Sequence, residues 1–218
     1  EKFYNCLRDN GVEFITGVPD SLLNDFCNFV QEKMNVDNHV ITANEGNAIA
    51  LAAGYNLATG SIPLVYMQNS GIGNSLNPLL SLTNREVYSI PMVILIGWRG
   101  DPAITDHAQH KKQGALTKAL LENMDIPFRI LENDICESLS AVEWAVSTAA
   151  EKSSPTALIV KKSVLSKDNK TEPEEPTDTN LLSREEAIEC ILQKLPDQTR
   201  YVATTGRATR ELYGLRKK

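Results

Sequence analysis

The sequence has few of the features that mark zinc proteins, membrane spans or nucleic-acid binders. Its four cysteines are widely scattered, without a Cys-x-x-Cys pair or a grouping with the three histidines. We therefore expect no structural zinc, no metal ligands among these residues, and a reducing, cytoplasmic location. The longest apolar runs, such as residues 48–53 and 92–97, are too short to cross a bilayer. The net charge of -6, without a basic stripe, disfavours binding to nucleic acid.

Short apolar runs alternate with amphipathic helical segments from the first residue to about residue 163. Six of these runs are predicted to be strands: 12–16, 39–42, 62–67, 92–98, 128–131 and 156–160. Because strand–helix alternation with short connections produces right-handed crossovers, we predict an α/β fold. Its sheet should be doubly wound, mainly parallel and six-stranded, with helices on both faces.

Four features of the predicted helices can be tested directly. The helix at 46–58 is apolar on nearly all sides, which predicts full burial. Asp20 or Ser21 is expected to cap the helix that follows the first strand. A helix over 74–82 should be interrupted early by Pro78. The polar stretch 99–113 is expected to be a long loop before a helix around 115–122.

The composition changes after residue 165. Residues 166–182 are rich in charge and proline, which predicts an exposed linker between a domain at 1–165 and a further segment at 183–218. Ser183 should open a helix with Glu186 as its capping-box partner, followed by a strand from residue 201 and a helix at 207–215. A lone helix–strand–helix cannot form its own core. We interpret 183–218 as the truncated start of a second domain.

Ligands of doubly wound sheets bind beyond the carboxyl ends of the strands, which nominates the loops at 17–21, 43–46, 68–73 and 99–113. Glu45, at a helix start, either complements the helix dipole or is buried and suited to exchange a proton near neutral pH. The glycines in 68–73 permit a tight turn or a close ligand approach. The third glycine of a dinucleotide fingerprint is missing.

The remaining two loops carry charged groups. Arg99 could hold a phosphonate or carboxylate with two hydrogen bonds, and His110 is a candidate for proton transfer. A solvated loop is the alternative. Asp20 and Ser21 are either a helix cap or part of the same site.

Together these segments resemble a known family. The stretch from Asn44-Glu45-Gly46 to Ala58-Thr59-Gly60 resembles the pyrimidine-binding domain of thiamine-diphosphate enzymes. The stretches 17–23, 65–71, 86–92 and 96–100 are more similar to phosphonopyruvate decarboxylases, and 204–212 resembles the start of their diphosphate-binding domain. This implies decarboxylation of 3-phosphonopyruvate to phosphonoacetaldehyde and carbon dioxide with thiamine diphosphate and Mg2+.

The resemblance also implies roles for individual residues. Glu45 would bond the pyrimidine nitrogen of the cofactor and act in catalysis with His110. The cofactor would contact Glu45, Asn69, Ser70 and Gly71, and the substrate would contact Asp20, Ser21 and Gln113. Arg99 as the phosphonate ligand is our own hypothesis. One departure is that His107-Ala108 stands where an acidic-proline pair is expected.

No Gly-Asp-Gly stretch followed by an asparagine occurs, so the usual ligands of diphosphate and Mg2+ are missing from the chain. We therefore expect the site to be completed by a diphosphate-binding domain of another subunit in a homo-oligomer, and the chain alone to be inactive. Two alternatives stay open: a sulfopyruvate decarboxylase subunit, and a non-catalytic flavodoxin-like module. Pro19 weakens the second because a phosphate loop needs backbone amides.

Overall fold

The computed structural model describes residues 1–165, 181–203 and 206–217, and the chain divides into two compact units. The first unit is Glu1–Asp168 and the second is Asn169–Lys218. Most of the predicted linker, residues 166–180, lies outside the described residues.

Six strands form one sheet in the first unit, and every neighbouring pair is parallel. The strands are β1 (Ile15–Gly17), β2 (His39–Ile41), β3 (Leu64–Gln68), β4 (Val93–Gly97), β5 (Phe128–Leu131) and β6 (Thr156–Val160). Their order is β2-β1-β3-β4-β6-β5, so the chain winds outward in opposite directions from β1 and from β3. The predicted six-stranded parallel sheet is confirmed, and its topological switch point lies between β1 and β3.

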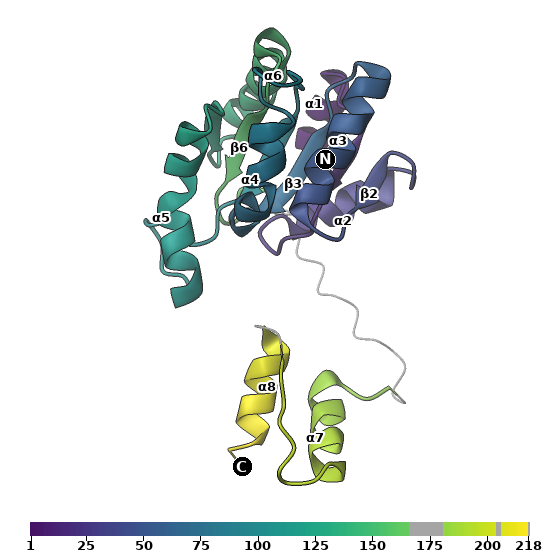
Figure 1. Cartoon of the computed structure of the whole chain (residues 1–218), viewed down its shortest axis with the longest axis vertical. Helices are drawn as coiled ribbons and strands as arrows, with labels where there is room; N and C mark the ends of the chain where they lie inside the picture. The colour runs from purple at the N-terminus through teal and green to yellow at the C-terminus, as the bar shows by residue number, and fades with distance from the viewer. Residues whose placement is uncertain (166–180, 204–205, 218) are drawn as a thin grey trace. The chain divides into compact units, whose positions relative to one another are not determined.

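Helices cover both faces of this sheet (Figure 1). The helices α1 (Lys2–Asp9), α2 (Asn24–Lys33) and α6 (Ile135–Lys152) pack with Leu64 and Tyr66 of β3 in one core. The other core joins α3 (Glu45–Thr59), α4 (Ile72–Ser81) and α5 (Ala108–Asn123) to Val65 and Met67. Since successive strand side chains point to opposite faces, β3 contributes to both cores. The doubly wound prediction is therefore confirmed.

The prediction that the helix at 46–58 is buried on nearly all sides is wrong for this chain. Its small side chains Ala48, Ala52 and Ala53 pack onto the sheet with no exposure above 1%. The opposite side of α3 is open, with Leu51 39% and Leu57 65% exposed. An apolar outer face of this kind is typical of a surface that another protein part covers.

The long loop predicted over 99–113 is also wrong, because α5 already begins at Ala108. Gly114 obscured this helix, since glycine costs about 1 kcal/mol relative to alanine in a helix interior. The structure requires glycine there: a Cβ at Gly114 would lie 1.7 Å from the Gly100 carbonyl oxygen. Pro78 does not interrupt α4, which runs through it to Ser81.

The second unit contains α7 (Arg184–Lys194) and α8 (Arg207–Leu215). The capping box of Ser183 and Glu186 is present at the start of α7, as predicted. The expected strand from residue 201 is not found over 201–203, and Thr204 and Thr205 lie outside the described residues. Among the helices that the structure describes, none is long and apolar enough to cross a membrane.

Candidate active site

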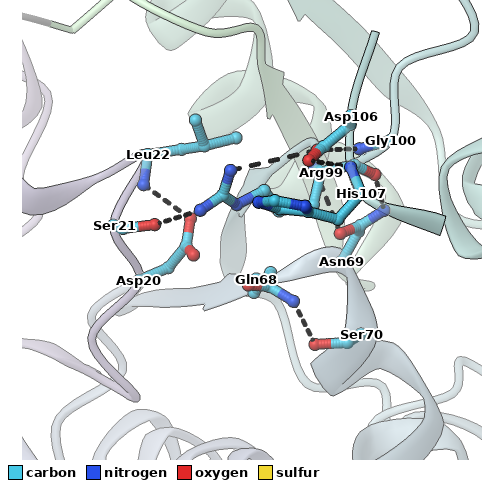
Figure 2. Close-up of polar contacts among 10 residues, drawn as sticks. All are labelled: Asp20, Ser21, Leu22, Gln68, Asn69, Ser70, Arg99, Gly100, Asp106 and His107. Atoms are coloured by element: carbon cyan, nitrogen blue, oxygen red, sulfur yellow. Dashed lines mark hydrogen bonds and ion pairs between the residues drawn. The ribbon is translucent and has the colours of Figure 1, made fainter. Parts of the chain in front are cut away.

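Three loops meet beyond the carboxyl ends of β1, β3 and β4, which are neighbours in the sheet. They are joined by side-chain hydrogen bonds (Figure 2). Between β3 and α4 lies a short 3-10 helix, η1 (Asn69–Gly71). This arrangement places the predicted loops at the switch point of the sheet, where ligands of such folds bind.

Arg99 lies at the centre of this cluster. Its Nη2 donates to Ser21 Oγ at 2.6 Å, and its Nη1 lies 3.9 Å from Asp106 Oδ2 (Figure 2). The side chain is 27% exposed, yet its Nε is buried without a hydrogen-bond partner in the described structure. A buried donor left unpaired costs about 1–3 kcal/mol, so this nitrogen is suited to a ligand acceptor.

Asn69 holds the main chain of Arg99. Its Nδ2 donates to the Arg99 carbonyl oxygen at 2.8 Å and to Thr117 Oγ1 at 2.9 Å. Its Oδ1 accepts from the Arg99 amide at 3.2 Å. Both amide hydrogens and the oxygen of this 3% exposed side chain are therefore engaged within the protein. A contact between the Asn69 side chain and the cofactor, as predicted, would have to share or replace one of these hydrogen bonds.

Asp106 has a central position that the sequence did not indicate. Its Oδ2 accepts from the Gly100 amide at 2.9 Å and its Oδ1 from the His107 amide at 2.7 Å. Although burial opposes it, these bonds and the charge of Arg99 hold the pKa of Asp106 below its usual range. An acid just before a helix is a common pattern, and it gives no sign of a neighbouring arginine.

Asp20 is buried, at 7% exposure, against β4. Its Oδ2 accepts from the Leu22 amide at 3.0 Å, and a Cβ added to Gly97 would lie 2.3 Å from this oxygen. Burial raises the pKa of Asp20, although the Leu22 amide and the charge of Arg99 act in the opposite direction. The carboxyl caps a turn, whereas α2 begins only at Asn24. Of the two readings, the helix cap is wrong.

His110 and Gln113 lie on α5 and not on a loop. His110 is half-buried, and within the described chain its Nδ1 is buried without a partner. A positive charge on its imidazole would lower the pKa of both Asp20 and Asp106. Gln113 is exposed, and its main-chain carbonyl oxygen accepts from Thr117 Oγ1 at 2.8 Å.

Glu45 forms a second group at the start of α3. Its Oε2 accepts from Asn74 Nδ2 at 2.8 Å. Gly71 packs so closely that an added Cβ would lie 2.4 Å from Glu45 Cγ and 2.6 Å from its Oε1. Ser70, between these groups, accepts a 2.6 Å hydrogen bond from Gln68. η1 thus contacts the Arg99 loop through Asn69 and Glu45 through Gly71.

The unpaired donor of Arg99 is suited to an oxyanion, and Glu45 offers a carboxylate that a polar ligand could bond. Glycine at 71 lets the Glu45 side chain pack against η1, and the buried Arg99 Nε and His110 Nδ1 have no hydrogen-bond partner among the described residues. In the part of the chain that the structure describes, no group of three or more His, Cys, Asp or Glu side chains could hold a metal ion.

The chain is similar in sequence to thiamine pyrophosphate enzymes. Residues 1–120 match the family model for the thiamine pyrophosphate enzyme N-terminal TPP binding domain. A phosphonopyruvate decarboxylase of Streptomyces viridochromogenes is 31% identical over 94% of this chain and 54% of its own length. The sulfopyruvate decarboxylase subunit alpha of Methanococcus maripaludis is 37% identical over 59% of this chain and 74% of its own length. That of Methanocaldococcus jannaschii is 33% identical over 72% and 89%.

The chain spans about half the length of the phosphonopyruvate decarboxylases that it matches. The family match itself covers more than half of the chain and includes Glu45, η1 and Arg99. The chain therefore belongs to the thiamine pyrophosphate enzyme family and carries its N-terminal cofactor-binding domain.

Proposed function

We propose that this chain supplies the pyrimidine-binding part of a thiamine-diphosphate-dependent decarboxylase for 2-keto acids that carry a second acidic group, with 3-phosphonopyruvate as the substrate. The observation that carries the proposal is the Glu45 carboxylate, which accepts a hydrogen bond from Asn74 and packs against Gly71 so closely that any side chain at position 71 would displace it. Glu45 would bond the pyrimidine ring of the cofactor, beside Ser70 and Gly71. When bound, thiamine diphosphate supplies an electron sink for the departing carboxylate.

Side chains of this chain would then orient the substrate and hold or deliver a proton beside it. Arg99, with its buried Nε unpaired, would bind the distal oxyanion, and Ser21 would hold the guanidinium from the other side. Asp20 retains a proton more readily than an exposed carboxyl because burial raises its pKa. With His110, it would hold or deliver a proton beside the substrate carbonyl. Gln113 would lie at the mouth of this site.

The substrate choice within this class is the finer part of the proposal. The 31% identity to a phosphonopyruvate decarboxylase over 94% of this chain favours a phosphonate. The 37% identity to a sulfopyruvate decarboxylase subunit favours a sulfonate as the second candidate. Both distal groups are tetrahedral oxyanions that a guanidinium binds well. Membership of the thiamine pyrophosphate family speaks against the non-catalytic flavodoxin-like module.

A substrate panel tests the proposal. The complete enzyme, with its diphosphate-binding part on the same chain or on another subunit, is supplied with thiamine diphosphate and Mg2+. Carbon dioxide release is then measured with phosphonopyruvate, sulfopyruvate and pyruvate. We expect the highest kcat/KM with phosphonopyruvate and a strong loss for Arg99→Ala. A preference for pyruvate, or no cofactor-dependent release from any of the three, would refute it.

We also propose that a diphosphate-binding domain of another subunit completes the site and supplies the ligands for Mg2+. The exposed apolar side chains on α3 and α4 support such a partner. They are Leu51, Leu57, Leu76 and Leu80, each at least 39% exposed. Leu57→Lys should dissociate the complete protein in sedimentation, whereas Val36→Lys, at a residue that is 82% exposed after α2, should not. An active monomer would contradict this assembly.

A further inference from the structure

Neighbouring residues hold Arg99 both by its main chain and by its guanidinium. Its backbone amide and carbonyl are both bonded to Asn69, its Nη2 to Ser21 and its Nη1 is paired with Asp106 (Figure 2). An arginine free in solvent loses about 2 kcal/mol of rotamer entropy when it is ordered. If the protein orders Arg99 before the substrate arrives, that loss does not reduce the affinity for the substrate.

Asn69 connects Arg99 to two other elements. It lies in η1 after β3, and besides Arg99 it bonds Thr117 on α5. Thr117 in turn donates to the carbonyl oxygen of Gln113 at 2.8 Å. At 3% exposure, Asn69 holds the Arg99 main chain, the β3 loop and α5 in one fixed arrangement.

Asp106 acts on the other end of the arginine. Its two oxygens are already occupied by the Gly100 and His107 amides, at 2.9 and 2.7 Å. It stays 3.9 Å from Arg99 Nη1, which is longer than a hydrogen bond. Asp106 therefore attracts the guanidinium electrostatically without taking up its donors, and Nε remains available for a ligand.

We infer that Asn69 and Asp106 are positioning residues, which fix Arg99 to receive the distal oxyanion and so set the preference for 2-keto acids with a second acidic group. The inference rests on the proposed function and deepens it. Asn69 thereby joins the cofactor side of the site to the substrate side, because Gly71, two residues later, packs against Glu45.

The test compares two substrates in the complete holoenzyme. Asp106→Asn removes the charge and places an NH2 group against one of the two backbone amides. We expect kcat/KM for phosphonopyruvate to fall on the order of 10- to 100-fold, mainly through KM. The value for pyruvate, which lacks the distal anion, should change less than about twofold. Asp101→Asn is the matched control, since that carboxylate lies in the same loop and accepts from the Ala103 amide.

A binding measurement gives a readout other than turnover. Calorimetric titration of the holoenzyme with phosphonoacetate should show a loss of affinity in Asp106→Asn of the same size as the change in KM. Asn69→Ser should lose affinity for phosphonoacetate to a similar extent, and this binding measurement replaces the one on Asp106→Asn if that variant does not fold. Equal losses with both substrates would mean a general structural role and would overturn the inference.

The two levels of the proposal fail differently. If the unmodified enzyme releases no carbon dioxide from either distal-anion substrate, the proposed function fails. If it does so and the variants keep an unchanged ratio between phosphonopyruvate and pyruvate, only the positioning role fails.

Discussion

Replacing Gly71 by alanine should separate catalysis from stability more cleanly than any other single change at this site. The added Cβ would lie 2.4 Å from Glu45 Cγ, and ordinary contacts begin near 3.4 Å, so the carboxylate arm must move by about 3.4 − 2.4 = 1.0 Å. A displacement of about 1 Å of a catalytic group can cost on the order of 100-fold in rate. We expect a loss of that size in kcat of the complete enzyme.

The same substitution should leave the fold almost unchanged. Alanine gains up to about 1 kcal/mol over glycine in helical structure. Displacing Glu45 breaks its exposed hydrogen bond with Asn74, which contributes roughly 1 kcal/mol. Because these terms nearly cancel, the unfolding free energy in urea should change by less than about 1 kcal/mol.

Gly73→Ala is the control for Gly71→Ala. Gly73 lies two residues later in α4, and nothing stands within 4 Å of an added Cβ. Its alanine variant should keep the normal rate. The prediction for Gly71 is refuted if Gly71→Ala retains more than about half of the activity. It is also refuted if Gly73→Ala loses as much activity as Gly71→Ala, because the loss would then not act through Glu45.

Three further predictions concern Glu45, Asp20 and the chain by itself. Glu45→Gln in the complete enzyme should slow proton exchange at the reactive carbon of bound thiamine diphosphate by at least about 100-fold, measured by NMR; a near-normal rate would remove Glu45 from its role. Burial raises the pKa of Asp20, so the folded state binds this proton more tightly than the unfolded state, whose pKa is about 3.9, and stability falls as pH rises through the raised pKa. Asp20→Asn should therefore raise Tm at pH 7 but not at about pH 3, and an increment independent of pH would contradict this. The chain by itself should release no carbon dioxide from phosphonopyruvate with added cofactor and Mg2+, and measurable turnover would show that it needs no partner domain.

The sheet could be predicted because its signals are local. Runs such as 92–98 and 156–160 are apolar enough to identify strands that are buried on both faces, and short connections fix their parallel direction. The boundaries of α5 could not be predicted, because Gly114 is determined by the approach of Gly100, fourteen residues earlier in the chain. A helix propensity carries no information about such a contact.

The candidate site divides in the same way. Arg99, Glu45 and Asp20 follow strands or begin helices, so their places could be predicted from element order alone. Their assigned roles toward cofactor and substrate remain predictions. The proposed roles of Asn69 as a bridge and of Asp106 as a counter-charge depend on which loops lie side by side. The strand order decides which loops are neighbours, and no local sequence pattern predicts that order.

The contact between Gly100 and Gly114 has a consequence for how the loop after Arg99 can vary over evolution. The loop is anchored at one end by this backbone contact and at the other by the bond from the Gly100 amide to Asp106. The intervening residues 102–105 are all exposed. Insertions and substitutions there can accumulate without shifting Arg99, whereas one methyl group on either glycine pushes the loop off α5. The loop therefore has a permissive segment four residues long, bordered by glycines to which a side chain cannot be added without moving the backbone.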